Sequence, residues 1–231
     1  KKFTDFKNLN IEYLIISSKK FFETEGGEIN VIEEYKNHKS SLEGGGFKSE
    51  VIYDDEIYEQ FGYGITYHPH SFKNFSHYVQ EHWNSLEYVF LIGKGLEYSF
   101  TRTNEQLRSP LTDIFFLPTY GIFPSDVLLF SDGKYVETKF AIGRLAAINM
   151  LQVKNYLEKL KIHDQVLKTG NAEWQKQIIH LGGGEPGKDQ DQILYHLTQM
   201  ENLAVSPKFG GEVHTFKKEN SSETAIANLD Q

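Results

Sequence analysis

The feature that most constrains the fold is the regular alternation of short apolar runs with segments of helical spacing. The apolar runs predict strands at residues 13–18, 49–53, 86–92, 140–143, 176–181 and 211–216. Apolar positions three or four residues apart predict helices at residues 28–42, 54–61, 71–83, 148–167 and 189–203. This alternation is typical of a three-layer α/β fold, in which helices cover both faces of a mostly parallel sheet. Ligands of such sheets bind beyond the carboxyl ends of the strands, so we expect a site in the loops after Ser18, Tyr53, Ile92 or Leu181.

A change in composition near residues 168–175 predicts a boundary between two subdomains. A polar stretch there separates a long predicted helix from a new strand. We therefore expect a first α/β subdomain at residues 1–168 and the start of a second at residues 169–231. Residues 217–231 are polar and contain no element that would complete a sheet. The second subdomain is accordingly expected to be truncated.

Charge and residue usage exclude several classes of protein. The chain has 24 Lys and Arg against 32 Asp and Glu, a net charge of −8, which argues against a nucleic-acid partner. No apolar run approaches the length of a transmembrane helix. The sequence contains no cysteine. These residues therefore hold no disulfide, no thiolate zinc ligand and no cysteine nucleophile.

The most motif-like segment is residues 182–188 (GGGEPGK), which lie between a predicted strand and a predicted helix. A phosphate-binding loop occupies the same context. Two features argue against that function: Asp189 stands where a Ser or Thr would hold Mg²⁺, and Glu185 would repel a phosphate. A flexible strand-to-helix turn is the favoured interpretation, and a P-loop-like nucleotide-binding α/β domain remains an alternative. The Gly93–Lys94–Gly95 motif is weaker, because Tyr98 replaces the third glycine of a dinucleotide site.

Histidine and acidic side chains form no complete metal-binding set. His68 and His70 flank a proline that we expect to open a helix, and no carboxylate cluster completes a zinc site. Acidic groups in the loop at residues 118–132 could bind Ca²⁺, but no cofactor is predicted. His180 and His214 lie inside apolar strands, so we expect both to be buried and hydrogen bonded.

Several motifs that are weak one by one occur in a more specific order and spacing. They are residues 13–16 (YLII), 51–64 (VIYDDEIYEQFGYG), 68–69 (HP), 88–95 (YVFLIGKG), 117–121 (LPTYG), 124–126 (PSD), 141–145 (AIGRL), 180–184 (HLGGG) and 211–216 (GEVHTF), with Trp174 before the HLGGG motif. In this order they resemble the gingipain-like cysteine peptidases, and most closely the sortase branch of the bacterial type IX secretion system. The resemblance runs through nearly the whole chain.

The resemblance implies a caspase-like fold and a cysteine endopeptidase that uses a His–Cys pair. In such a pair the imidazole helps generate the thiolate, which attacks the peptide carbonyl. The family's histidine is followed by glycine, whereas His214 precedes Thr215 and lies one strand too early, so we assign no catalytic residue. We expect the chain to be the N-terminal portion of a peptidase domain, inactive alone, with the pair supplied by the remainder of that domain.

The resemblance also implies partners and a location. A protein or peptide substrate, secretion-system proteins, and the bacterial cell envelope or the cell exterior are expected. The part of the substrate cleft predicted for this chain is one wall, formed by Gly182, Gly183, Gly184, Glu185, Asp189 and Asp191.

Arginine-specific relatives carry an acidic residue before the glycine turn to support the histidine, and an aspartate at the next helix start to receive a basic side chain. Asp189 or Asp191 falls at the helix start, as that pattern requires. The position before the turn is Gly182, which is not acidic, so no preference for basic substrates is predicted. A non-catalytic interaction module on the same fold is the other alternative.

Overall fold

The computed structural model describes residues 3–24, 30–97, 113–131, 137–170, 173–185 and 187–217. The chain divides into two compact units, Lys1–Gln165 and Val166–Gln231, and each is described by itself. The strands are β1 (Tyr13–Ser17), β2 (Ser49–Tyr53), β3 (Tyr88–Ile92), β4 (Ala141–Leu145), β5 (Gln177–Gly182) and β6 (Glu212–Lys217). The helices are α1 (Lys20–Thr24), α2 (Val31–Ser40), α3 (Asp54–Phe61), α4 (Pro69–His82), α7 (Asp126–Phe130), α8 (Met150–Thr169) and α9 (Lys188–Ala204), with 3₁₀ turns η1 (Phe6–Asn8) and η2 (Glu173–Lys176).

The first unit is built on a parallel four-stranded sheet in the order β2-β1-β3-β4. The central strand β1 is buried along its whole length, and Ile15 pairs in register with Val51 on one side and Phe90 on the other. Each parallel pairing requires a crossover connection, and the helices provide these. The sequence-based prediction of an α/β fold with a parallel sheet is confirmed.

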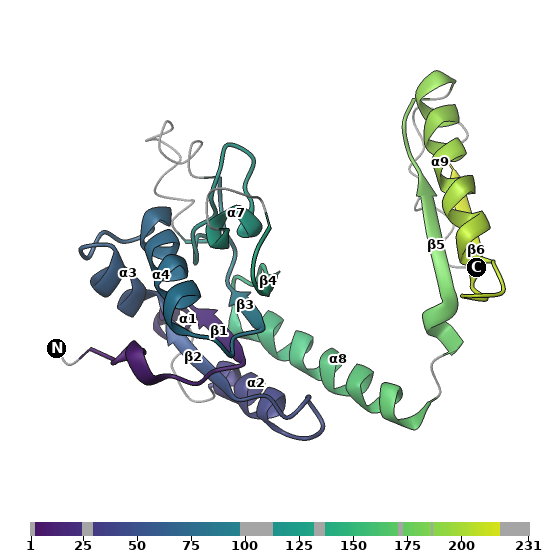
Figure 1. Ribbon diagram of the computed structural model, residues 1–231. Helices are drawn as coiled ribbons and strands as arrows, with labels where there is room; N and C mark the ends of the chain where they lie inside the picture. The colour runs from purple at the N-terminus through teal and green to yellow at the C-terminus, as the bar shows by residue number, and fades with distance from the viewer. Residues whose placement is uncertain are drawn as a thin grey trace. The chain divides into compact units, whose positions relative to one another are not determined.

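Helices cover both faces of this sheet (Figure 1). Leu14 and Ile16 of β1 point to one face, where α3, α4 and α7 contribute side chains such as Phe72 to the core. Ile15 points to the other face, where α2 and α8 contribute side chains such as Tyr35. The alternation of side chains along a strand therefore divides the apolar residues of β1 between two cores.

The helix starts are set by local hydrogen bonds. The side chain of Asn30 accepts a hydrogen bond from the Glu33 amide and caps α2. His68 caps α4 by accepting from the His70 amide through Nδ1, and Pro69 occupies the first helical position, as predicted. None of the helices among the described residues is both long enough and apolar enough to cross a membrane.

The second unit pairs β5 with β6 in parallel, and α9 packs against this pair. Ile178 and His180 of β5 share the face toward α9, whereas Ile179 and Leu181 point to the other face. On that other face Ile179 is 55% exposed and Leu181 is 47% exposed. This face, which also carries Gln177, Glu212 and His214, is therefore partly open to solvent.

Two short helices, α1 and α7, were not predicted from the sequence. Helices α1 and α7 are five residues each, too short for apolar periodicity to identify. Residues 118–132 were expected to form a loop, and α7 corrects that expectation. Its signal was the Ser125 side chain, which accepts from the Leu128 amide as an N-cap.

Candidate functional site

The predicted cleft wall is a strand-to-helix turn of the second unit. Gly182 ends β5 and is buried, and the chain then turns through Gly183 and Gly184 toward α9. Gly184 has a left-handed backbone (φ +87°), and a Cβ on it would lie 3.0 Å from Ile193 Cδ1. Glycine is therefore required there by both backbone conformation and packing. Nothing lies within 4 Å of the corresponding position on Gly183.

The three predicted carboxylates of this turn are exposed. Glu185 lies in the turn, and Asp189 and Asp191 lie in the first turn of α9. Gly187 precedes the helix without a side-chain cap, and its carbonyl accepts from the Asp191 amide at 2.8 Å. Acidic residues in a first helical turn stabilise the helix through its dipole, which gives both aspartates a structural role. All three carboxylates are accessible to a basic or polar group of a ligand.

The geometry adds nothing to the nucleotide-binding alternative. The Glu185 carbonyl accepts from the Gln190 amide at 3.2 Å, so the turn is closed by its own backbone. Position 189 is an exposed aspartate, without the hydroxyl that would hold Mg²⁺. Pro186 lies outside the described residues.

The two histidines of β5 and β6 differ in environment. His180 is 8% exposed, as expected, but its Nδ1 has no hydrogen-bond partner among the described residues. The prediction that His214 is buried is wrong: it is exposed, with Nε2 3.1 Å from Gln177 Oε1 and 3.5 Å from Glu212 Oε1. It belongs to the open face of the β5–β6 pair, and strand periodicity alone cannot tell an open face from a covered one.

The carboxyl edge of the first-unit sheet holds a buried carboxylate that the sequence analysis did not single out. Asp54 follows β2 and accepts hydrogen bonds from Ser18 Oγ at 2.7 Å and from the Lys19 amide at 3.0 Å. Burial raises the pKa of Asp54 above its ordinary value. Ser18 is also buried, so its hydroxyl is inaccessible to a substrate. These contacts tie the end of β1 to the end of β2.

A second polar centre at this edge is Arg144 of β4. Its guanidinium donates to both carboxylate oxygens of Asp126, through Nε at 2.9 Å and Nη2 at 2.7 Å. It also donates to the carbonyls of Gly93 at 2.7 Å and Pro118 at 2.8 Å. Both oxygens of Asp126 are thus engaged by Arg144, and Asp132, the other acidic residue of the proposed calcium loop, lies outside the described residues.

The histidines near the start of α4 are held by local contacts. The rings of His68 and His70 lie 5.3 Å apart, and burial together with the neighbouring His70 lowers the pKa of His68. His82 Nδ1 lies 2.8 Å from the Tyr78 carbonyl. The described residues contain no group of three or more His, Cys, Asp or Glu side chains arranged to hold a metal ion.

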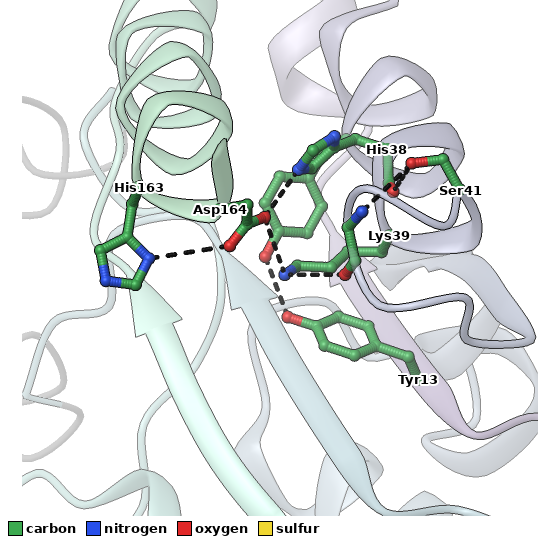
Figure 2. A network of polar contacts seen from close by, with 8 residues as sticks. Tyr13, His38, Lys39, Ser41, His163 and Asp164 are labelled. Carbon is green, nitrogen blue, oxygen red and sulfur yellow. Dashed lines mark hydrogen bonds and ion pairs between the residues drawn. The ribbon is translucent and has the colours of Figure 1, made fainter. Parts of the chain in front are cut away.

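A polar network lies at the opposite, amino end of β1 (Figure 2). Asp164 of α8 accepts from His38 of α2, with Nε2 and Oδ2 2.9 Å apart, and Lys39 Nζ lies 4.0 Å from the same carboxylate. Ser41 Oγ donates to the His38 carbonyl at 2.7 Å and not to its imidazole, so these side chains do not form a nucleophilic triad. The network joins α2 to α8.

Beside this network two buried tyrosines share a hydrogen bond. The hydroxyl oxygens of Tyr13 and Tyr35 lie 2.9 Å apart. Burial raises the pKa of Tyr13 to about 12 and that of Tyr35 further, so both phenols stay neutral at physiological pH. Their role is structural: the pair satisfies two buried hydroxyls inside an apolar core.

Comparison with known proteins places the chain in a family. Searches of curated proteins and of solved structures returned no match. The sequence does match the family described as Peptidase family C25, over residues 6–226. The match includes the parallel sheet of the first unit, the glycine turn after β5 and strand β6. Because it spans nearly the entire sequence, the chain belongs to peptidase family C25.

Proposed function

We propose that this chain supplies the sheet scaffold and one wall of the substrate cleft to a cysteine endopeptidase whose His–Cys pair lies outside these 231 residues. Family membership supports a protein or peptide substrate, and the sequence contains no cysteine. Gly182, Gly183 and Gly184 would shape the wall, with Glu185, Asp189 and Asp191 lining it.

The observation that carries this proposal is the open face of the β5–β6 pair. Parallel sheets are normally covered on both faces, because their crossover connections place helices there. Here α9 covers one face, while Ile179 and Leu181 remain about half exposed on the other. Further elements of the catalytic subdomain would bury this face and bring the histidine and cysteine to the carboxyl ends of the strands. Residues 169–231 would then form the first part of that subdomain.

The finer assignment is the sortase branch of the type IX secretion system, acting in the bacterial cell envelope or at the cell surface. It is supported by the order of the motifs, including HLGGG at residues 180–184 and GEVHTF at residues 211–216. Secretion-system proteins would be its partners.

The test compares this chain with the longer product of its gene, if the gene continues past Gln231, on a panel of fluorogenic peptides. We expect no cleavage by the 231-residue chain, and cleavage by the longer product that iodoacetamide abolishes. Cleavage by the 231-residue chain would contradict the proposal. A longer product without cysteine or activity would instead favour the non-catalytic interaction module.

A further inference from the structure

The two outer strands of the first-unit sheet, β2 and β4, differ in how their free edges are covered. The Lys48 carbonyl accepts from the Tyr13 amide of β1, and main-chain groups alternate in direction along a strand, so the Val51 amide points outward. This amide donates to Glu50 Oε1 at 3.0 Å, and Lys36 Nζ lies 3.6 Å from the same oxygen. A charged pair therefore covers the edge of β2, which is a common protection against further strand pairing.

The free edge of β4 is open. The Ala141 amide and the Leu145 carbonyl form hydrogen bonds of 2.8 and 2.9 Å with the residues just before and just after β3. By the same alternation, Ile142 and Arg144 turn their main-chain groups outward. Among the residues that the structure describes, none bonds to these two amides and two carbonyls. An unpaired strand edge of this kind is a template for pairing with another strand.

The β4 edge is complementary to itself. Facing residues of antiparallel strands alternate between pairs that exchange two hydrogen bonds and pairs that exchange none. When Gly143 faces Gly143 of a second copy in a pair of the second kind, Ile142 of each copy faces Arg144 of the other in a pair of the first kind. All the outward amides and carbonyls of both strands are then bonded. Ala141 faces Leu145 of the other copy, which places a small side chain opposite a large one.

Glycine suits the centre of this arrangement. Facing Cα atoms lie about 4.5 Å apart where no hydrogen bonds are exchanged, and Gly143 brings no side chain into that space. We propose that two copies of this chain associate by antiparallel pairing of their β4 strands about Gly143, which makes their four-stranded sheets continuous. A second copy is the occupant because twofold symmetry brings this edge against its own complement. The ladder is short, so the dimer is weak and forms as the concentration rises. The association does not depend on the peptidase pair.

The first experiment uses the absence of cysteine from the chain to test the register. Gly143→Cys should give a disulfide-linked dimer on mild oxidation, because the facing Cα atoms lie about 4.5 Å apart, within disulfide reach. Ala141→Cys is the matched control, since Ala141 and Gly143 are both exposed on the same strand. Its counterpart in the second copy lies four residues away along the strand, about 13 Å, which is too far for a disulfide. We expect at least about tenfold less crosslinked dimer from the control.

The second experiment places charges on the proposed axis and measures sedimentation velocity. A Cβ on Gly143 would lie 3.4 Å from Phe90 Cδ2, an ordinary contact, so side chains fit there, and circular dichroism checks the fold. Gly143→Glu and Gly143→Lys should each weaken association about fivefold through like charges that face each other, and an equimolar mixture should restore it. Asn37→Glu adds the same charge at an exposed position of α2, which packs beside β2, and should leave association unchanged.

The proposal predicts a shift from monomer to dimer as the concentration of the unsubstituted chain rises. A chain that stays monomeric and does not crosslink would overturn it, as would equal crosslinking of the two cysteine variants. If the cysteine variants fail to fold, the charge variants decide, and a mixture that does not associate would overturn it. Crosslinks of Gly143→Cys that form only with an added cysteine-containing strand peptide, and not between chains, would show that this edge takes a different partner.

Discussion

Replacing Arg144 by leucine should destabilise the first unit strongly. The guanidinium is 10% exposed and the Asp126 side chain 24% exposed, and the change leaves that carboxylate and the Gly93 and Pro118 carbonyls without their donor. Removing one partner of a buried pair costs about 3–5 kcal/mol. Because Asp126 keeps some contact with water, we expect the lower end, about 3 kcal/mol, which corresponds to a fall in Tm of about 6–12 °C for a unit of this size.

The chain contains two tryptophans, and their positions allow unfolding of the first unit to be followed by fluorescence. Trp83 is buried in the first unit, where its Nε1 donates to the Phe6 carbonyl at 2.8 Å, whereas Trp174 belongs to the second unit. In a Trp174→Phe background, fluorescence during urea unfolding therefore reports the first unit alone.

Two comparisons test the cause of the expected loss. Arg144→Lys keeps the charge but loses the planar guanidinium that binds both Asp126 oxygens. We expect it to lower the free energy of unfolding by about 1–2 kcal/mol. The exposed Lys154→Met serves as the control and should change stability by less than about 0.5 kcal/mol. If Arg144→Leu costs under about 1 kcal/mol, or if Arg144→Lys is as stable as the parent, the reasoning about this pair is wrong.

Two further predictions concern a buried acid and a glycine. Burial raises the pKa of Asp54, so the native chain binds that proton more tightly than the unfolded chain does; its contribution to the free energy of unfolding falls as pH rises from about 4 through the raised pKa. Asp54→Asn should remove this dependence on pH from the free energy of unfolding, measured by urea titrations of the first unit. An unchanged dependence would show that it does not come from Asp54. Gly184→Ala should destabilise the turn before α9 by about 1–2 kcal/mol, because of its left-handed backbone and its approach to Ile193. Hydrogen exchange in β5 and α9 should then accelerate about 5–30-fold, with Gly183→Ala, which meets no neighbouring atom, as the control; equal effects of the two would contradict the argument.

Much of the fold was predictable because its elements have strong local signals. Strand β1 reads as an uninterrupted apolar run, and helix α4 combines Pro69 at its start with Phe72, Phe75 and Val79 on one face. The alternation of such elements identified the parallel sheet. Helix α7 was missed, since its five residues span little more than one turn and its start depends on one hydroxyl of Ser125.

The polar centres were harder to predict because they depend on pairings distant in sequence. Arg144 and Asp126 each stood out in a short motif, yet nothing local indicates that two elements 18 residues apart meet at the sheet edge. Similarly, Ser18 and Asp54 are brought together by the pairing of β1 with β2. The environment of His214 was mispredicted because burial of a strand face depends on which other elements cover it. The cleft wall at Gly182–Glu185 stays a prediction.

The position of β1 at the centre of the sheet has a consequence for biosynthesis. Among the strands described it is made first, yet its partner β3 begins 75 residues later, as the pairing of Tyr13 with Tyr88 shows. At about 5–20 residues per second, the ribosome releases β1 about 4–15 s before β3 is available. During that interval the apolar segment Leu14 to Ile16 can pair only with β2, so one edge of β1 stays without its partner. Translation speed and chaperone access should therefore influence the yield of folded protein more than the final stability does.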